Sequence, residues 1–155
     1  MFDSLPQILA IVGAGLVTGL LFAFSNFVMR ALADLPMEQG MRAMQLINER
    51  IINPVFVIFF LGTPLACVLL LWQSIREIEQ VGAMLTLAGA VLYLLGPLGI
   101  TMTKNVPLNN QLAGTDACNA DPVWIDYQRS WQFWNHVRTV AGTLAILLLS
   151  MGLVA

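Results

Sequence analysis

The chain has 155 residues, of which 58% are hydrophobic and only 10% are charged, and its mean hydropathy is +0.78. This composition excludes an ordinary soluble domain and predicts an integral membrane protein. The formal net charge of −2 says little about partners, but the sequence has no basic tract or nucleic-acid-binding motif, so we expect no nucleic-acid partner. We therefore expect this protein to function within or beside the bilayer.

The first predicted span covers about residues 5–29, which contain no charged residue and are long enough to cross a hydrocarbon core of about 30 Å. The preceding Met1-Phe2-Asp3 has no basic side chain, and the apolar run exceeds the length of an export-signal core, so we expect the span to be retained. One helix face carries Gly15, Gly19, Phe22, Asn26 and Arg30. We expect this face to point inward, with Asn26 as either an interhelical or a ligand contact.

Residues 36–53 predict a short amphipathic helix. Apolar residues recur there at helical spacing while charged residues occupy the other faces. We favour a helix that lies on the membrane surface, and the alternative is a cover of adaptable methionine side chains over a site. Asn53 followed by Pro54 predicts the start of the next helix.

Three further spans follow, at about residues 55–72, 81–103 and 133–153. Gly96-Pro97-Leu98-Gly99 predicts a kink in the third. The last helix is expected to begin near Pro122, capped by Asp121. Its aromatic and polar residues recur every three or four positions and so share one stripe, namely Trp124, Tyr127, Trp131, Asn135 and Arg138.

The predicted fold is all-α: a four-transmembrane-helix bundle in a single membrane domain, residues 1–155, with a short amphipathic interfacial helix between spans one and two. Most basic residues fall at the ends where spans one and three finish, and only Arg76 falls at the opposite ends. The positive-inside rule then places the loops after spans one and three in the cytoplasm and both termini outside, in what we expect to be a bacterial inner membrane.

This topology gathers polar side chains from every span at one membrane face. An arginine within a span is costly, on the order of 2.5 to 3.5 kcal/mol on insertion scales, and usually faces the protein interior. We therefore expect Arg138 to have a buried or functional role, whereas Arg30 and Arg129 are expected to reach lipid phosphate. The candidate catalytic residues are Arg138, His136 and Lys104. The candidate substrate-binding residues are Asn26, Asn105, Asn109, Tyr127, Trp131, Trp134 and Asn135.

No metal cofactor is expected. His136 is the only histidine, and the two cysteines, Cys67 and Cys118, have neither the spacing of a metal site nor a reason to pair. His136 is a candidate general base or an interfacial hydrogen-bonding residue, and its position about 100° around the helix from Asn135 leaves its facing open.

Three separated motifs resemble the anthrone oxygenase-like membrane proteins: Phe24-Ser25-Asn26-Phe27, Thr103-Lys104-Asn105-Val106-Pro107-Leu108-Asn109, and Trp131-x-x-Trp134-Asn135-x-x-Arg138. The resemblance covers nearly the whole chain. It implies oxidation of an anthrone to an anthraquinone by molecular oxygen, without a recognised metal or flavin. Aromatic rings, asparagine amides and the two cations, Arg138 and Lys104, are residue types that suit a phenolic anion.

Three hypotheses remain open from the sequence. The first is a cofactor-independent oxygenase acting on a hydrophobic phenolic substrate at the cytoplasmic leaflet. The second is a non-catalytic protein that binds a lipid, a quinone or a similar hydrophobic small molecule. The third is a structural or partner-binding membrane protein, for which the Gly15-x-x-x-Gly19 pair and the amphipathic helix suffice. We rank the oxygenase first, on the resemblance.

Overall fold

The computed structural model describes residues 4–116 and 120–155. Met1-Phe2-Asp3, Cys118 and the Asp121 side chain, all considered above, lie outside the described residues. The described part is helical throughout, and its elements in chain order are α1 (Leu5–Ala23), η1 (Phe24–Val28), α2 (Met29–Ala33), α3 (Met37–Arg50), α4 (Pro54–Arg76), α5 (Val81–Tyr93), η2 (Leu94–Asn105), α6 (Val106–Ala113) and α7 (Ala120–Val154).

Four continuous helical segments in the described residues are long and apolar enough to cross a membrane: Leu5–Ala33, Pro54–Arg76, Val81–Ala113 and Pro122–Val154. A helix satisfies its backbone polar groups by its own hydrogen bonds, and the apolar side chains of these segments suit a lipid environment. The predicted all-α bundle is confirmed, and the chain is an integral membrane protein.

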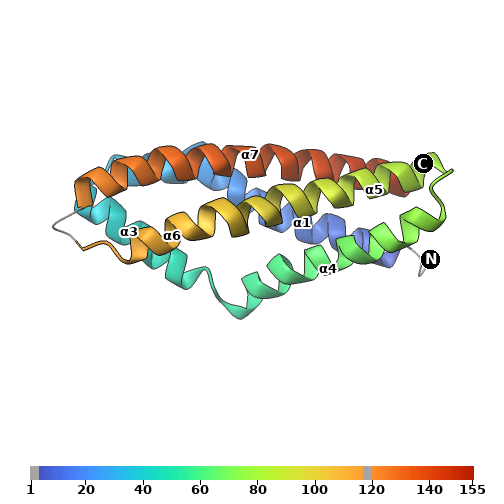
Figure 1. Ribbon diagram of the computed structural model, residues 1–155, viewed down its shortest axis with the longest axis horizontal. Helices are drawn as coiled ribbons and strands as arrows, with labels where there is room; N and C mark the ends of the chain where they lie inside the picture. Colours follow the sequence, from blue (N-terminus) through green and yellow to red (C-terminus); the bar gives the residue numbers. More distant parts are fainter. Residues whose placement is uncertain (1–3, 117–119) are drawn as a thin grey trace.

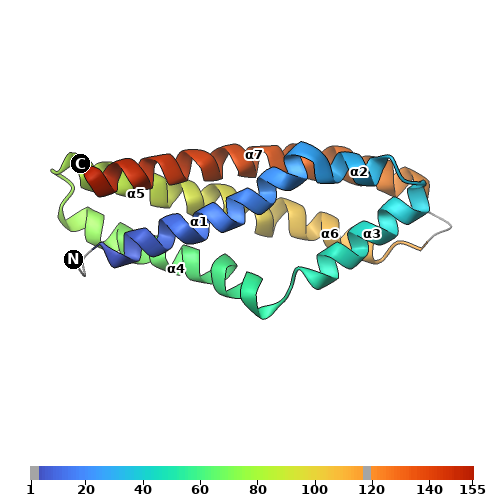
Figure 2. The same cartoon turned by 180° about the vertical axis from the view of Figure 1, so that it is seen from behind.

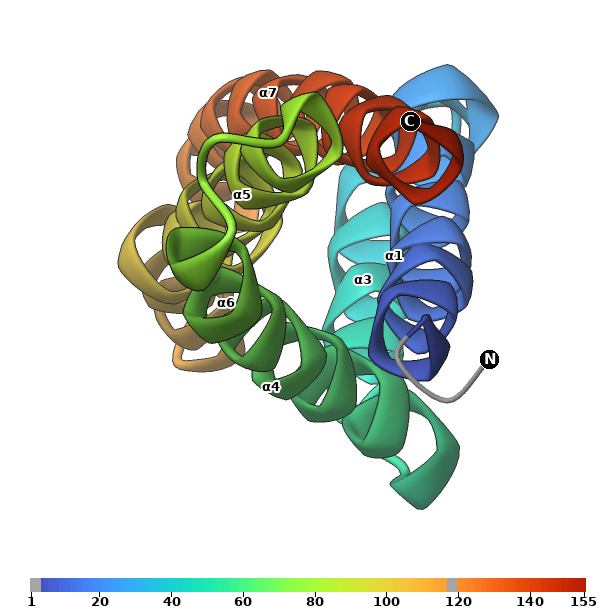
Figure 3. The ribbon, with the colours of Figure 1, turned by 90° about the vertical axis from the view of Figure 1, so that its right-hand side faces the viewer.

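The bundle is elongated, and its helices surround a central axis (Figures 1 and 3). α5 packs along α7, and α1 packs between α4 and α7. The start of α1 and the end of α7 lie at the same end of the bundle, while α3, α6 and the start of α7 lie at the other (Figures 1 and 2). We call this second end the head. Near its junction with α3, α4 diverges from the other helices.

The head has its own apolar core because three of the four long segments extend beyond the predicted spans. α3 packs against α2, α6 and α7 there, and the Met41 and Met44 side chains are buried. Its methionine face is therefore a protein contact, as the alternative prediction of a methionine cover requires, and Met44 lines the cavity described below. The position of this helix at the membrane surface stays a prediction. The core of the head consists of Phe24, Met29, Leu32, Met41, Met44, Leu112, Trp124, Tyr127 and Trp131.

The second core fills the opposite half of the bundle and is built from small residues, which allow close helix approach. A Cβ atom at Gly89 would lie 3.0 Å from the Ala145 carbonyl oxygen, and one at Gly142 would collide with the Thr18 hydroxyl. This half is less uniformly apolar than the sequence suggested, since the Gln7 amide is buried and donates to the Thr86 hydroxyl at 2.8 Å.

The predicted inward face of the first span is wrong. All five residues of that face are exposed, namely Gly15, Gly19, Phe22, Asn26 and Arg30. No packed atom lies within 4 Å of a Cβ built on either glycine. The buried stripe consists instead of Gln7, Ala10, Ala14, Val17 and Leu21. In lipid both faces of a helix are apolar, so glycine spacing alone does not identify the packed one.

Two segments adopt π-helical hydrogen bonding, which is uncommon and concentrates at functional sites. η1 follows α1 at the level of Trp131, and η2 includes Pro97, where the sequence predicted a kink. At the start of α4, the Asn53 side chain accepts a hydrogen bond from the Phe56 backbone at 3.1 Å, which confirms the predicted cap.

Candidate functional site

An apolar cavity of about 370 Å³ lies between the head and the diverging start of α4. Its volume is typical of small-molecule sites. We call it the Arg138 chamber. The only polar or charged side chains that line it, within the described part of the chain, are Asn48, Thr101, Asn109 and Arg138, together with the Trp131 indole. The remaining lining is apolar: Val17, Leu20, Leu21, Phe24, Met44, Ile47, Ile51, Ile52, Phe56, Val57, Phe60, Leu61, Met102 and Val106.

Arg138 is held in place by neighbours from two elements, η2 and α7. One terminal nitrogen of its guanidinium donates to the Thr101 hydroxyl at 2.8 Å, and the other donates to the Asn135 side-chain oxygen at 2.7 Å. The guanidinium carbon lies 5.3 Å from the centre of the Trp131 ring, within the range of a cation–π contact. Asn135 is fixed in turn, since its amide nitrogen donates to the Leu21 carbonyl and to the Ser25 hydroxyl, both at 2.8 Å.

The charge of Arg138 is buried without a counter-ion. Its side chain is 4% exposed, its Nε has no hydrogen-bond partner, and among the side chains of residues 4–116 and 122–155 no carboxylate pairs with it. An uncompensated buried charge is strongly unfavourable. The lining therefore favours a ligand that brings a negative charge, or a developing one, into an otherwise apolar chamber.

Asn109 joins two aromatic residues at the edge of the chamber. Its side-chain oxygen accepts hydrogen bonds from the Tyr127 hydroxyl at 2.8 Å and from the Trp131 indole nitrogen at 2.9 Å. Asn105, which is buried, donates to the Trp131 backbone carbonyl at 3.3 Å and does not line the chamber. Asn105 thus supports the site from outside, whereas Asn109 and Trp131 form part of its wall.

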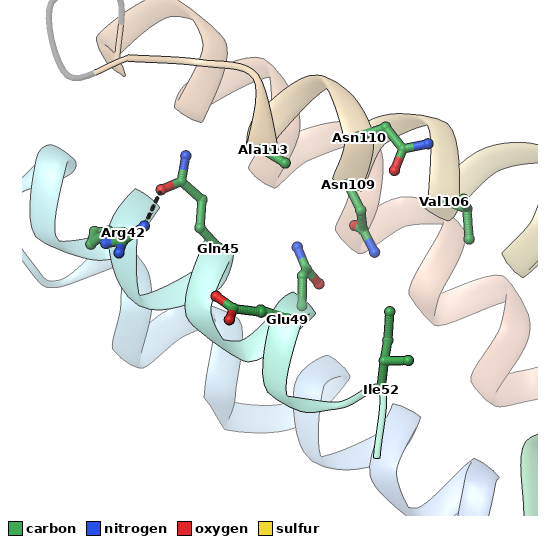
Figure 4. A pocket seen from close by; sticks show the side chains of 9 residues that line it. Arg42, Gln45, Glu49, Ile52, Val106, Asn109, Asn110 and Ala113 are labelled. Atoms are coloured by element: carbon green, nitrogen blue, oxygen red, sulfur yellow. Dashed lines mark hydrogen bonds between the residues drawn. The ribbon is translucent and has the colours of Figure 1, made fainter. Parts of the chain in front are cut away.

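A second cavity of about 360 Å³ adjoins the chamber between α3 and α6 (Figure 4). Most of its lining is polar, so we call it the polar vestibule. The two cavities share four lining residues, which are Asn48, Ile52, Val106 and Asn109. The Arg42, Gln45, Glu49 and Asn110 side chains line the vestibule alone. The site therefore has an apolar part and a polar part that meet at these shared residues.

Four of the predicted site residues lie elsewhere. Asn26 is exposed on the outer face of η1, and Lys104 is exposed with its ammonium 5.2 Å from the centre of the Trp134 ring. His136 is exposed and lines a surface groove of about 490 Å³ between α2 and α7. Trp134, the fourth, is half-buried. None of these four lines the chamber.

The structure brings the other predicted residues together. Arg138, Trp131 and Asn109 line the chamber, while Asn135, Tyr127 and Asn105 hold those three in place. The sequence analysis did not assign site roles to Asn48, Thr101 or Met44. Asn48 carried a usable signal, because it follows Met44 by four residues and so lies on the apolar face of the amphipathic helix.

The described residues contain no group of three or more histidine, cysteine, aspartate or glutamate side chains arranged to hold a metal ion. Cys67 is buried as a free thiol in the second core, away from the chamber lining. The chemistry available in the chamber is therefore that of a fixed guanidinium, hydroxyl and amide groups, and aromatic faces.

Comparison with known proteins gives one family. The sequence model described as anthrone oxygenase matches residues 54–148, more than half of the chain. The match runs from α4 through most of α7 and includes Thr101, Asn109, Asn135 and Arg138. No curated protein and no solved structure matches the chain.

Proposed function

Since the chain belongs to the anthrone oxygenase family, we propose that it is a membrane-embedded oxidoreductase that uses molecular oxygen to oxidise a hydrophobic, anthrone-like phenolic substrate. The observation that carries this proposal is the buried, uncompensated charge of Arg138 in the wall of an apolar chamber. Such a site suits a planar aromatic molecule that becomes anionic during its reaction.

In the proposed reaction the substrate becomes an anion, and the main role of the protein is to stabilise that anion. Loss of a proton from the methylene carbon of an anthrone places negative charge on the carbonyl oxygen through the ring system. The Arg138 guanidinium stabilises that oxyanion, and the Trp131 face packs against the rings. Oxygen then bonds to the methylene carbon and accepts its electrons. One oxygen atom remains as the new carbonyl, and the other leaves as water with the two hydrogens of the methylene group.

The proton leaves through the polar vestibule in this proposal. No carboxylate or imidazole lines the chamber in the part of the chain that the structure describes, whereas Glu49 lines the vestibule. We assign His136 and Lys104 no role in this step, because both are exposed away from the chamber. We place the reaction at the cytoplasmic leaflet of a bacterial inner membrane and propose that it proceeds without a metal or flavin.

The test is oxygen uptake with an anthrone substrate by the protein purified in detergent, measured above the spontaneous rate. We expect clear acceleration by the wild type and a loss of roughly 10²- to 10³-fold in Arg138→Gln, the scale for removal of an oxyanion-stabilising donor. Arg129→Gln is the matched control, since Arg129 is an exposed arginine on the same helix that does not line the chamber. Equal rates in both variants contradict the proposal.

A second function is favoured by one observation: no conventional base lines the described chamber wall. A non-catalytic protein that binds a quinone, a lipid or a related hydrophobic small molecule needs the aromatic wall and Arg138 but no base. Ligand binding that depends on Arg138, with no acceleration of oxygen uptake over a panel of anthrones and quinols, supports this second function and eliminates the first.

A further inference from the structure

The Arg138 chamber and the polar vestibule meet at a pair of asparagines. Asn48 reaches this junction from α3, and Asn109 reaches it from α6, where its side chain projects toward α3 (Figure 4). Both side chains are partly buried. We call the two residues the neck pair, since they are the two polar side chains that line both cavities.

Trp131 fixes the orientation of the Asn109 amide. An indole nitrogen can only donate a hydrogen bond, so the Asn109 atom that lies 2.9 Å from it must be the oxygen. The Tyr127 hydroxyl lies 2.8 Å from the same oxygen and donates its single proton to it. Both interactions use the oxygen, so the Asn109 amide nitrogen is left as a donor on the other side of the side chain.

The same reasoning fixes Asn48. The Tyr127 hydroxyl has donated its proton to Asn109, so toward Asn48 it can only accept. The Asn48 amide nitrogen is therefore the atom that lies 3.4 Å from the hydroxyl. Its side-chain oxygen faces away from Tyr127. With the side chains of residues 4–116 and 122–155, neither that oxygen nor the Asn109 amide nitrogen makes a hydrogen bond.

The neck pair thus presents one free acceptor, on Asn48, and one free donor, on Asn109. A hydroxyl group satisfies both, because it donates and accepts at once. An ether or a carbonyl satisfies only the donor, and a hydrogen or methyl group satisfies neither.

We propose that Asn48 and Asn109 determine ligand specificity by binding a hydroxyl group of the ligand that is separate from the oxygen at Arg138. This inference rests on the proposed function, because it assumes that the chamber binds an aromatic ligand with an oxygen at Arg138. It adds that the ligand carries a second oxygen, as a hydroxyl, and that the neck pair sets the direction in which the ring system lies. Asn48 lies outside the segment that the family model matches.

The experiment compares two small aromatic probes, 2-naphthol and 2,6-dihydroxynaphthalene, which differ by one hydroxyl at the far end of the rings. Affinities are measured by isothermal titration calorimetry with the full chain in detergent. We expect the wild type to bind the dihydroxy probe roughly tenfold more tightly, as two modest hydrogen bonds provide. We expect 6-methoxy-2-naphthol, which accepts but does not donate at that end, to bind more weakly than the dihydroxy probe.

Asn109→Asp tests the neck pair with little change in shape. The substitution keeps an oxygen toward Trp131 and Tyr127 and replaces the free amide nitrogen with a second oxygen. A ligand hydroxyl can still donate to the new carboxylate, but an ether oxygen there loses its only donor. We therefore expect 6-methoxy-2-naphthol to lose roughly tenfold in affinity relative to 2,6-dihydroxynaphthalene in this variant. The control is Asn110→Asp, which adds the same charge at the next position of α6, where the side chain lines only the vestibule. We expect this control to keep the wild-type ratio of the two affinities.

Equal binding of 2-naphthol and 2,6-dihydroxynaphthalene by the wild type, or the same change of relative affinities in both aspartate variants, overturns the role proposed for the neck pair. Arg138→Gln separates this failure from failure of the proposed function. If Arg138→Gln binds both probes more weakly but the wild type shows no preference for the second hydroxyl, the proposed Arg138 site is retained and only the neck-pair proposal fails. Affinities that are unchanged by Arg138→Gln overturn both proposals.

Discussion

At the scale of single residues, the site depends on Asn135. Its oxygen accepts from Arg138, and its nitrogen donates to the Leu21 carbonyl and the Ser25 hydroxyl, so one fully buried amide joins α1, η1 and α7. A side chain that satisfies several buried groups has a larger effect on stability than its own hydrogen bonds suggest. Its removal leaves each partner unpaired in a dry environment.

We expect Asn135→Leu to destabilise the protein by roughly 2 to 4 kcal/mol, because Arg138 loses one of its two hydrogen-bond acceptors while it remains buried. The measurement is thermal unfolding in detergent. Asn26→Leu is the matched control, since Asn26 is an exposed asparagine with no hydrogen bond among the described residues, and its midpoint is expected to stay close to that of the wild type. Midpoints that fall equally in both variants contradict the role assigned to Asn135.

The burial of Arg138 was predictable from sequence, and the facing of several other polar residues was not. An arginine well inside an apolar run has one favourable solution, which is to face the protein interior, and the three- and four-residue spacing back to Trp131 identified its stripe. Asn26, Lys104 and His136 lie near the ends of the predicted membrane spans, where water and headgroups also satisfy polar groups. Sequence position alone therefore did not show which of them would line a cavity.

At the scale of helices, glycine spacing predicted the wrong packed face for the first span. Gly15 and Gly19 match a common packing motif, yet both are exposed, whereas Gly89 is buried against the backbone of α7. The contacts that decide which glycine is packed come from residues distant in sequence, such as Ala145 and Leu149 opposite Gly89. The π-helical hydrogen bonding of η1 and η2 was also absent from the prediction, since it depends on packing against α7 as well as on local sequence.

The glycines provide a direct test of the packing. We expect Gly89→Leu to prevent close approach of α5 and α7 and to lower stability by at least about 2 kcal/mol, since the obstructing atoms are backbone atoms that cannot rotate away. Gly19→Leu, the same substitution on an exposed face, is expected to change stability little. The readout is the thermal midpoint in detergent, together with the yield of monodisperse protein. A larger loss in Gly19→Leu favours the original prediction for the first span.

The amphipathic helix, α3, contributes both to the core of the head and to the candidate site. Its existence and its methionine face were predictable from helical spacing, but its partner was not, because an apolar face suits lipid and protein equally well. In the structure, that face closes the head through Met41 and Met44 and contributes Asn48 to the junction of the two cavities. The same helix therefore connects stability of the head with the shape of the site.

At the scale of the whole molecule, charge and cavities are gathered at one end. The head carries Arg42 and Arg50 on α3, and both cavities of the candidate site lie beside it. At the opposite end, Arg76 is the last residue of α4, and its guanidinium carbon lies 4.5 Å from the centre of the Trp72 ring. The four-helix class followed from hydropathy alone, whereas the head did not. Its helices continue several turns past the apolar runs and are stabilised by aromatic packing with α3.

This asymmetry predicts the orientation of the protein in the membrane. Single cysteines replace Asn110, in the head, or Glu79, at the opposite end, in a Cys118→Ser background expressed in a bacterial host. We expect a membrane-impermeant thiol reagent to label Asn110→Cys in inside-out vesicles and Glu79→Cys in intact spheroplasts, because basic residues favour the cytoplasmic side. The reverse pattern places the head outside and contradicts the proposed cytoplasmic site.

The central claim is that the Arg138 chamber holds the ring system of an aromatic ligand with its oxygen at the guanidinium. The most direct test is an experimental structure of the protein with an anthrone bound under anaerobic conditions, which prevent its oxidation. The account predicts ligand density in the chamber, with one ligand oxygen about 2.7 to 3.0 Å from an Arg138 nitrogen and a ring against Trp131. Ligand bound instead in the surface groove beside His136, with no ligand in the chamber, contradicts it.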